Sequence, residues 1–242
     1  MHFRTRIIQF LIDINERIFF YPRLYGFYSA QLKKKDITVI DVGSNKGQSI
    51  DFFCKINRKA VIFGFEPNRK LFLKLVEKYH SNPGIRLYNT GISNQCGQLV
   101  FHENILDETS TFQEINYESI YLAKKAKVLG VDKKELIVDS YNVDVTTLKV
   151  FLTEHPGIFF DVLKIDVEGH EFQSLQGLFD GNGKELSVRY IQIESHNDDM
   201  YLNTSVKEIK ELLNNNGFNE VARIKHGFGD FYEIVYENRH IA

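Results

Sequence analysis

Val39-Ile-Asp-Val-Gly-Ser-Asn-Lys-Gly-Gln48 is the stretch that decides the fold of this chain. Apolar residues from Ile37 lead into it, glycines interrupt it, and an apolar pattern of helical period resumes at Ile50. This order predicts a buried parallel strand, a tight turn and a helix. Glycines let a ligand approach the backbone closely, and the free N–H groups at a helix start face that ligand. We therefore expect a nucleotide-like cofactor against Asp41, Gly43, Ser44, Asn45 and Gly47.

A second apolar strand, residues 60–66, ends in an acid. Glu66 lies 19 residues after Gly47. An acid about 20 residues past the glycines is placed to accept hydrogen bonds from ribose hydroxyls. A glycine turn alone is also typical of close packing, but the turn and the acid together favour a bound nucleoside.

The nature of the nucleoside follows from a missing glycine. The dinucleotide fingerprint needs a second glycine where a pyrophosphate presses on the backbone, and Asn45 occupies that position. Asp41, just before the turn, suits a cofactor with a positive ammonium group and no phosphate. S-adenosylmethionine fits this description better than a nicotinamide dinucleotide.

Five segments in order resemble the motifs of the FkbM-type methyltransferases. They are Asp41-Val-Gly-Ser-Asn-Lys-Gly47, Phe65-Glu-Pro-Asn68, Thr90-Gly-Ile-Ser93, Val143-Asp-Val-Thr-Thr-Leu148 and Leu163-Lys-Ile-Asp-Val-Glu-Gly-His-Glu171. The resemblance implies a class I, Rossmann-like fold that uses S-adenosylmethionine, usually for O-methylation of sugars or natural-product hydroxyls. It also implies cofactor contacts from Pro67, Asn68 and Asp166, and adenine contacts from Asn89, Ile92 and Ser93.

The chain has 242 residues, 43% of them hydrophobic and 26% charged, with a net charge of −2. These values indicate one globular α/β domain, expected over residues 36–242, and argue against a nucleic-acid partner held by charge. Charges interrupt the N-terminal apolar stretch, so we expect no signal peptide, no transmembrane segment and a cytoplasmic protein. Cys54 and Cys96 are expected to be reduced.

An N-terminal helical cap is expected over residues 1–35, because residues 3–20 form an amphipathic pattern. We favour packing on the sheet or a homo-oligomer interface over contact with a membrane surface, because acids share the polar face with bases. Residues 102–140 have a weaker apolar pattern, which predicts an inserted lid. Thr109, Ser110 and Glu168 are the candidate substrate contacts.

Seven strands are expected in a doubly wound, mostly parallel sheet with helices on both faces: 37–40, 60–66, 85–92, 161–166, 188–193, 219–224 and 231–236. Ligands of such sheets lie at the carboxyl ends of the strands. That rule brings Asp41, Glu66, Asp166 and Glu194 to one edge.

Transfer of a methyl group to a sugar hydroxyl needs alignment and a base or a metal, because the hydroxyl is barely ionised at neutral pH. The candidate catalytic residues are Asp166, His170, Glu194 and His196. We favour His196 or Asp166 as the base, while Glu168 and Glu171 suit architecture equally well. Lys164, inside an apolar strand, is expected to pair with one of these acids.

A divalent metal is a less favoured alternative, with Asp166, Glu194 and His196 as ligands for Mg²⁺ or Mn²⁺. The leading hypothesis is O-methylation of a small-molecule or glycan hydroxyl, free or lipid-linked. A nicotinamide-dependent oxidoreductase and a non-catalytic S-adenosylmethionine-binding scaffold protein remain the alternatives.

Overall fold

The computed structural model describes residues 18, 20–32, 36–105, 109–179, 186–196, 200–201, 206–226 and 231–241. Most of the amphipathic helix expected over residues 3–20 lies outside these ranges. The side chain of His196 lies outside the described part as well.

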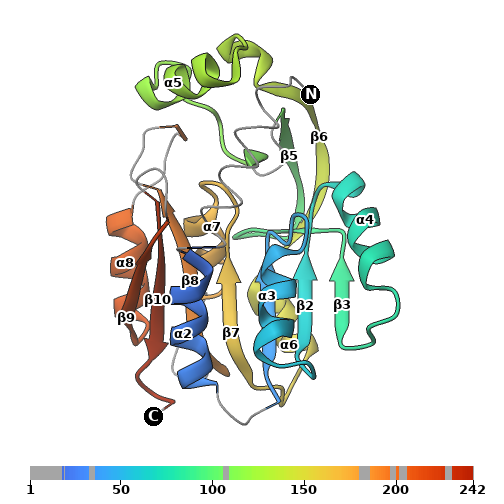
Figure 1. Ribbon diagram of the computed structural model, residues 1–242, viewed down its shortest axis with the longest axis vertical. Coiled ribbons are helices and arrows are strands. Elements are labelled where there is room, and N and C mark those ends of the chain that lie inside the picture. The colour runs from blue at the N-terminus through green and yellow to red at the C-terminus, as the bar shows by residue number, and fades with distance from the viewer. Residues whose placement is uncertain are drawn as a thin grey trace.

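A seven-stranded sheet forms the centre of the molecule, in the order β3-β2-β1-β7-β8-β10-β9 (Figure 1). The strands are β1 Thr38–Val42, β2 Val61–Phe65, β3 Ile85–Tyr88, β7 Phe160–Ile165, β8 Val188–His196, β9 Phe218–Lys225 and β10 Phe231–Asn238. The first five run parallel, and β10 pairs antiparallel with both β8 and β9. The predicted seven-stranded, mostly parallel Rossmann-like sheet is confirmed.

Helices cover both faces of this sheet. On one face, α2 Tyr21–Gln31 and α3 Gln48–Ile56 pack on an apolar cluster that includes Val39, Ile62 and Val162. On the other, α6 Leu148–Glu154, α7 Glu171–Gln176 and α8 Val206–Asn215 pack on a second cluster. The helix α4 Arg69–Tyr79 lies beside β3.

A smaller sheet stands over one end of the central sheet (Figure 1). Its strands are β4 Gly91–Ile92, β6 Ile137–Thr146 and β5 Gly97–Asn104. The helix α5 Ile120–Leu129 and the short 3₁₀ helix η3 Lys133–Glu135 lie within the connection between β5 and β6. We call residues 91–146 the lid.

The prediction of a single strand over residues 85–92 is wrong, because this segment is divided between the two sheets. The chain leaves the central sheet after Tyr88 and joins the lid sheet at Gly91. Two side chains fix this break: Asn89 donates to the carbonyls of Glu66 and Pro67, and Thr90 donates to the carbonyl of Asp144. A strand pattern in the sequence cannot show such a change of sheet.

Polar side chains cross the sheet face under α2. The register places Asp41 of β1 beside Lys164 of β7, and Lys164 beside Gln192 of β8. Because neighbours in register point to the same face, these side chains lie together in the core. Asp41 is 0% exposed, Lys164 7% and Gln192 1%. In the neighbouring pair of strands, β8 and β10, Glu194 lies opposite Glu233.

The substitution Gly43→Ala is expected to destabilise the protein by about 2 kcal/mol or more, because the residue has a positive φ and a Cβ there would overlap a carbonyl. The φ of Gly43 is 85°, and its Cβ would lie 1.9 Å from the carbonyl oxygen of Asp166. Urea denaturation measures the change. Gly26→Ala in α2 is the matched control: no atom lies within 4 Å of its Cβ position, and roughly 0.5–1 kcal/mol of stabilisation is expected. Equal effects of both substitutions would contradict this account of the turn.

Candidate functional site

A cavity of about 190 Å³ lies at the carboxyl ends of the central strands. Its wall combines the turn after β1, the ends of β2, β7 and β8, the helix α2 and the lid. The polar lining residues are Ser44, Asn45, Gln48, Ser49, Glu66, Ser110, Lys164, Asp166, Glu168, Gln192, Glu194, His226 and Glu233; the aromatic ones are Phe20, Tyr21, Phe52, Phe53, Phe101 and Phe112. The cavity lining therefore combines aromatic side chains with several acids.

The turn after β1 is tied to the end of β2. The N–H groups of Gly43 and Ser44 both donate to the carbonyl of Phe65, each at 3.0 Å. Asn45 has a φ of 47°, in the left-handed region that few residues other than glycine adopt. Its side-chain oxygen is buried and has no hydrogen-bond partner among the described residues. The turn thus presents a polar group that a ligand in the cavity could engage.

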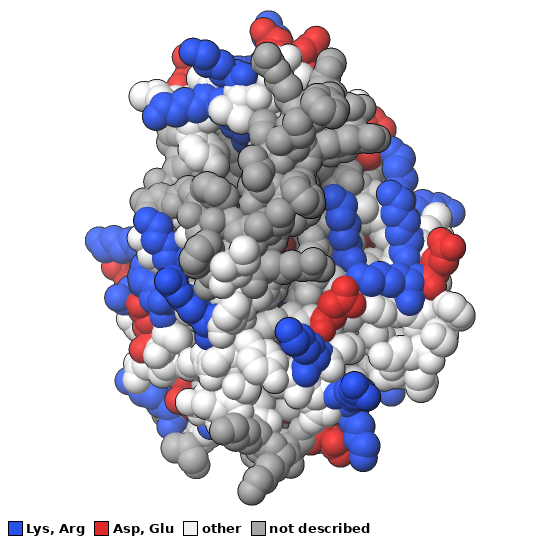
Figure 2. All heavy atoms as spheres, in the orientation of Figure 1, with Lys and Arg blue, Asp and Glu red and all other residues white. Residues whose placement is uncertain are grey.

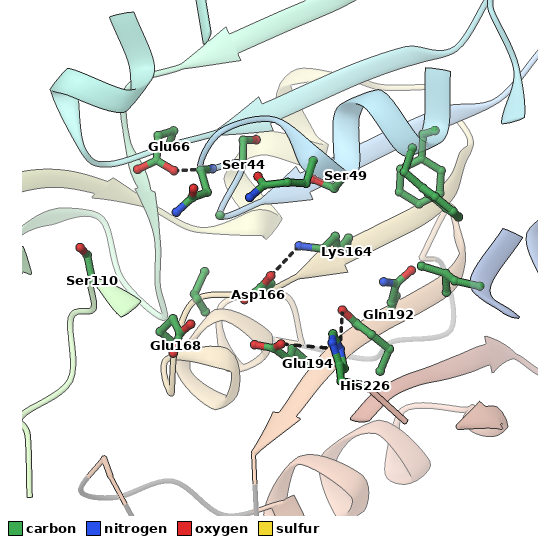
Figure 3. A pocket seen from close by; sticks show the side chains of 18 of the residues that line it. Ser44, Ser49, Glu66, Ser110, Lys164, Asp166, Glu168, Gln192, Glu194 and His226 are labelled. Atoms are coloured by element: carbon green, nitrogen blue, oxygen red, sulfur yellow. Dashed lines mark hydrogen bonds and ion pairs between the residues drawn. The ribbon is translucent and has the colours of Figure 1, made fainter. Parts of the chain in front are cut away.

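Glu66 is held rigidly in the cavity wall. One carboxylate oxygen accepts a hydrogen bond from the N–H of Asn45 at 2.7 Å, and the other accepts from the N–H of Asn68 at 2.8 Å (Figure 3). The residue is 4% exposed. Each carboxylate oxygen can accept more than one hydrogen bond, so Glu66 keeps capacity for a ligand hydroxyl.

Lys164 is the cation of the cavity floor. Its Nζ lies 2.9 Å from Asp166 Oδ2 and 3.9 Å from Asp41 Oδ1. Burial alone would lower the pKa of the ammonium group, but the carboxylates of Asp166 and Asp41 outweigh it and raise the pKa above its ordinary value. The predicted ion pair of Lys164 with a strand-end acid is confirmed. Asp41 also accepts a 2.7 Å hydrogen bond from the hydroxyl of Ser44.

A second charged group lies on β8 and the β9–β10 hairpin. His226 Nε2 is 3.7 Å from Glu194 Oε1 and 3.9 Å from Glu233 Oε1. Burial raises the pKa of Glu233 to about 7, with Lys164 opposing the rise and Glu194 adding to it. The His226 ring stacks on Phe20, with 4.0 Å between ring centroids. Figure 3 shows Glu194 and His226 pointing toward one another, across the cavity from Glu66.

The sequence analysis missed His226 and Glu233. The apolar pattern predicts residues 231–236 only as a strand, but Glu233 interrupts that run in a strand that pairs on both sides. An acid inside a strand flanked by two others is the signal that could have found it.

The structure brings nine of the predicted site residues to the cavity: Gly43, Ser44, Asn45, Glu66, Pro67, Ser110, Asp166, Glu168 and Glu194. Eight others do not line it: Asp41, Gly47, Asn68, Asn89, Ile92, Ser93, Thr109 and His170. Several of these have structural partners instead. Asn68 caps α4 by accepting from the N–H groups of Lys70 and Leu71, and Ile92 is 1% exposed in the core.

His170 links the rim to the lid. Gln113 donates its amide N–H to His170 Nδ1 at 2.8 Å, so the imidazole carries its proton on Nε2, which lies 2.9 Å from the Ser93 hydroxyl. Burial lowers the pKa of His170 to about 4. Both ring nitrogens are occupied and the neutral form is stable, which favours a structural role over proton transfer.

The turn after β7 is braced by its own acids. Glu171 accepts from the N–H groups of Val167 and Gly169, at 3.1 and 3.2 Å. The Glu168 carboxylate accepts from the hydroxyl of Tyr201 at 2.8 Å, and its carbonyl accepts from Thr111 of the lid at 2.7 Å. The lid and the rim are therefore one connected structure.

The charge of the cavity differs from that of the described residues on the face shown in Figure 2. Figure 2 shows basic side chains in separate groups with acids among them. In the cavity lining, five acids, Glu66, Asp166, Glu168, Glu194 and Glu233, face one lysine, Lys164. This excess of acids favours a ligand with positive charge.

Solved structures with the same fold are methyltransferases. The magnesium protoporphyrin IX methyltransferase ChlM from Synechocystis PCC 6803, solved with bound SAM, matches with a TM-score of 0.51 and 11% identity, over 98% of this chain and 83% of that chain. The METTL16 MTase domain matches with a TM-score of 0.52 and 11% identity, over 90% of this chain and 66% of that chain. The fold is therefore that of the Rossmann-like, S-adenosylmethionine-dependent methyltransferases.

The family is defined more narrowly by the sequence itself. Residues 41–220 match the methyltransferase FkbM domain, so the chain belongs to the FkbM methyltransferase family. The resemblance that its motifs indicated is confirmed.

Two characterised relatives are similar to this chain. Hexuronic acid methyltransferase AglP of Haloferax volcanii is 27% identical over 164 residues, which cover 67% of this chain and 57% of AglP. The 2-O-methyltransferase NoeI of Sinorhizobium fredii is 23% identical over 172 residues, which cover 70% of this chain and 68% of NoeI. The matched region thus spans little more than half the length of AglP. Within the described part of the chain, no helix is both long and apolar enough to cross a membrane.

His170 is expected to make the protein sensitive to acid. Its folded pKa is about 4, below the ordinary value of 6.5, so the stability that comes from its neutral form is complete above pH 6.5 and is lost as the pH falls toward 4. The loss is on the order of 3 kcal/mol. The free energy of unfolding of wild type and His170→Asn, measured from pH 7 to 4, tests this. The variant should show a flatter profile, whereas His80→Asn, at an exposed histidine, controls for the loss of an imidazole. Parallel profiles for wild type and His170→Asn would contradict the expectation.

Proposed function

We propose that this protein is an S-adenosylmethionine-dependent O-methyltransferase that methylates a hydroxyl of a sugar or glycan. The observation that carries the proposal is the fixed carboxylate of Glu66 beside the turn at Asn45, on one wall of a cavity whose other wall is acidic. The names of AglP and NoeI support a sugar hydroxyl as the acceptor.

The cofactor fits the cavity by shape and by charge. Glu66 would accept hydrogen bonds from the ribose hydroxyls, and the turn from Gly43 to Asn45 would lie along the nucleoside. The sulfonium and ammonium groups would face the acids of the opposite wall. A nicotinamide dinucleotide would bring two phosphates into the same cavity, whose lining has five acids and one lysine, and would be repelled.

Asp166 is the proposed base. It follows the central strand β7 directly, and its side chain is 30% exposed to the cavity. Lys164 holds it at 2.9 Å and fixes its direction. In this proposal Asp166 would accept the proton of the acceptor hydroxyl, whose oxygen would take the methyl group in line with the sulfur. The carbon–sulfur bond would break at the same time, and S-adenosylhomocysteine would leave. Alignment of the reacting atoms can contribute about 7–11 kcal/mol to lowering the barrier.

Asp41 has an indirect role in this scheme. Its carboxylate is fully buried and contacts Ser44 and Lys164, so it positions the turn and the ammonium group. The positive end of the cofactor would instead meet another acid that lines the cavity, such as Glu194.

Calorimetry with S-adenosylhomocysteine and NAD, side by side, tests the cofactor. Wild type is expected to bind the first and not the second, and Glu66→Ala is expected to weaken binding about 10- to 100-fold, because hydrogen bonds to a charged group are lost. Glu237→Gln is the control: this acid pairs with Arg189 at the opposite end of β10 and should leave affinity unchanged. Tight NAD binding, or affinity indifferent to Glu66, would contradict the proposal.

Transfer itself is tested with methyl-labelled S-adenosylmethionine and a panel of neutral sugars and hexuronic acids. Asp166→Asn is expected to lower kcat by about 10²- to 10⁴-fold, because a carboxamide cannot accept the proton. Its affinity for S-adenosylhomocysteine, measured by calorimetry, shows whether the cofactor site survives. Cofactor binding by wild type without methylation of any hydroxyl would favour a scaffold protein, and a full kcat in the variant would remove Asp166 from the role of base.

A further inference from the structure

We propose that Glu194, His226 and Glu233 form a binding site for a divalent transition-metal ion in the wall of the cavity. One carboxylate comes from β8, the other from β10, and the imidazole follows β9. We call these three residues the Glu-His-Glu site. It does not include Asp166, and it does not depend on the proposed function.

The geometry suits one ion. One ligand atom from each residue lies within 4.8 Å of the others. His226 Nε2 is 3.7 Å from Glu194 Oε1 and 3.9 Å from Glu233 Oε1. Ligand atoms that share an ion at bonds of about 2.0–2.2 Å lie at most roughly 4.4 Å apart. Small side-chain rotations therefore bring all three to an ion without any change in the backbone.

The surroundings of Glu233 independently favour a cation at this position. Glu233 is 3% exposed and lines the cavity. Its Oε2 atom is buried and has no hydrogen-bond partner among the described residues. The register places it directly opposite Glu194, where like charges repel. The lysine of the cavity floor is held by Asp166 at 2.9 Å. Because burying a charge without a partner is costly, a cation between the two glutamates would stabilise this arrangement.

The three residues are held by rigid elements. Glu194 and Glu233 lie on paired strands, and the N–H of His226 donates to the carbonyl of Phe231 at 3.1 Å. The imidazole is stacked on Phe20, with an angle of 16° between the rings. Ligands fixed in this way lose little side-chain entropy when an ion binds.

The ligand set selects the kind of ion. One imidazole nitrogen and two carboxylates suit Mn²⁺, Fe²⁺ or Zn²⁺ better than Ca²⁺, which prefers six or more oxygens. A second group, Asp166, Glu168 and Glu194, has the same spacing but oxygen ligands alone. There Asp166 is paired with Lys164 and Glu168 accepts from Tyr201. Those partners make it the weaker candidate.

Binding of Mn²⁺ to the chelator-treated 242-residue chain, followed by the EPR signal of free Mn²⁺, tests the site. Wild type is expected to bind one ion, and Glu233→Gln and His226→Asn are each expected to weaken binding at least tenfold. Glu168→Gln, which changes the competing group, should stay within about threefold of wild type. Pulsed EPR of the bound ion should show nitrogen coupling that His226→Asn removes. Thermal melting confirms that each variant is folded.

Several outcomes would overturn the site: no Mn²⁺ binding by wild type, binding abolished by Glu168→Gln but not by Glu233→Gln, or a bound ion without nitrogen coupling. Calorimetry with S-adenosylhomocysteine is run on the same preparations. If the protein binds the metal but not S-adenosylhomocysteine, the Glu-His-Glu site is supported and the proposed methyl transfer is contradicted. The failure of one proposal is thus distinguishable from the failure of the other.

Discussion

The buried ammonium group of Lys164 is the interaction on which the rest of the site depends. It lies between the ends of β1 and β7, 2.9 Å from Asp166 and 3.9 Å from Asp41. Removing one partner from such a buried pair costs about 3–5 kcal/mol, because the other charge is left unpaired. The pair holds together the two strand ends at which Gly43 passes close to the carbonyl of Asp166. The ion pairs of Lys164 therefore help to hold the turn that faces the proposed cofactor in its conformation.

One lysine does not balance the acids of the cavity. Glu66 is satisfied by two backbone N–H groups, but Asp166, Glu194 and Glu233 lie on neighbouring strands with Lys164 as the nearby ammonium group. S-adenosylmethionine carries one net positive charge, so its arrival would reduce the repulsion without removing it. Burial raises the pKa of Glu233 to about 7, and the nearby carboxylate of Glu194 adds to the rise. The same excess underlies both the preference for a cationic cofactor and the Glu-His-Glu site.

The sequence was sufficient for the features that depend on local pattern. The strand, turn and helix around Gly43 follow from apolar period and glycine spacing, and Thr147 caps α6 as expected for that residue type. Glu66 and Asp166 reach the cavity because strand ends of a parallel sheet share an edge. The position of Lys164 in an apolar strand was also enough to predict an ion pair.

Features that depend on pairing between distant segments could not be predicted in this way. Glu233 meets Glu194 only because β10 runs antiparallel beside β8 in one particular register. His170 was a candidate base by residue type, and its neutral, buried state depends on Gln113 and Ser93, which come from the lid region. Since Thr111 also binds the carbonyl of Glu168, the lid fixes the backbone that follows Asp166. The direction of the proposed base is thus set partly by residues more than fifty positions away, so a substitution in the lid can alter the site without touching a ligand.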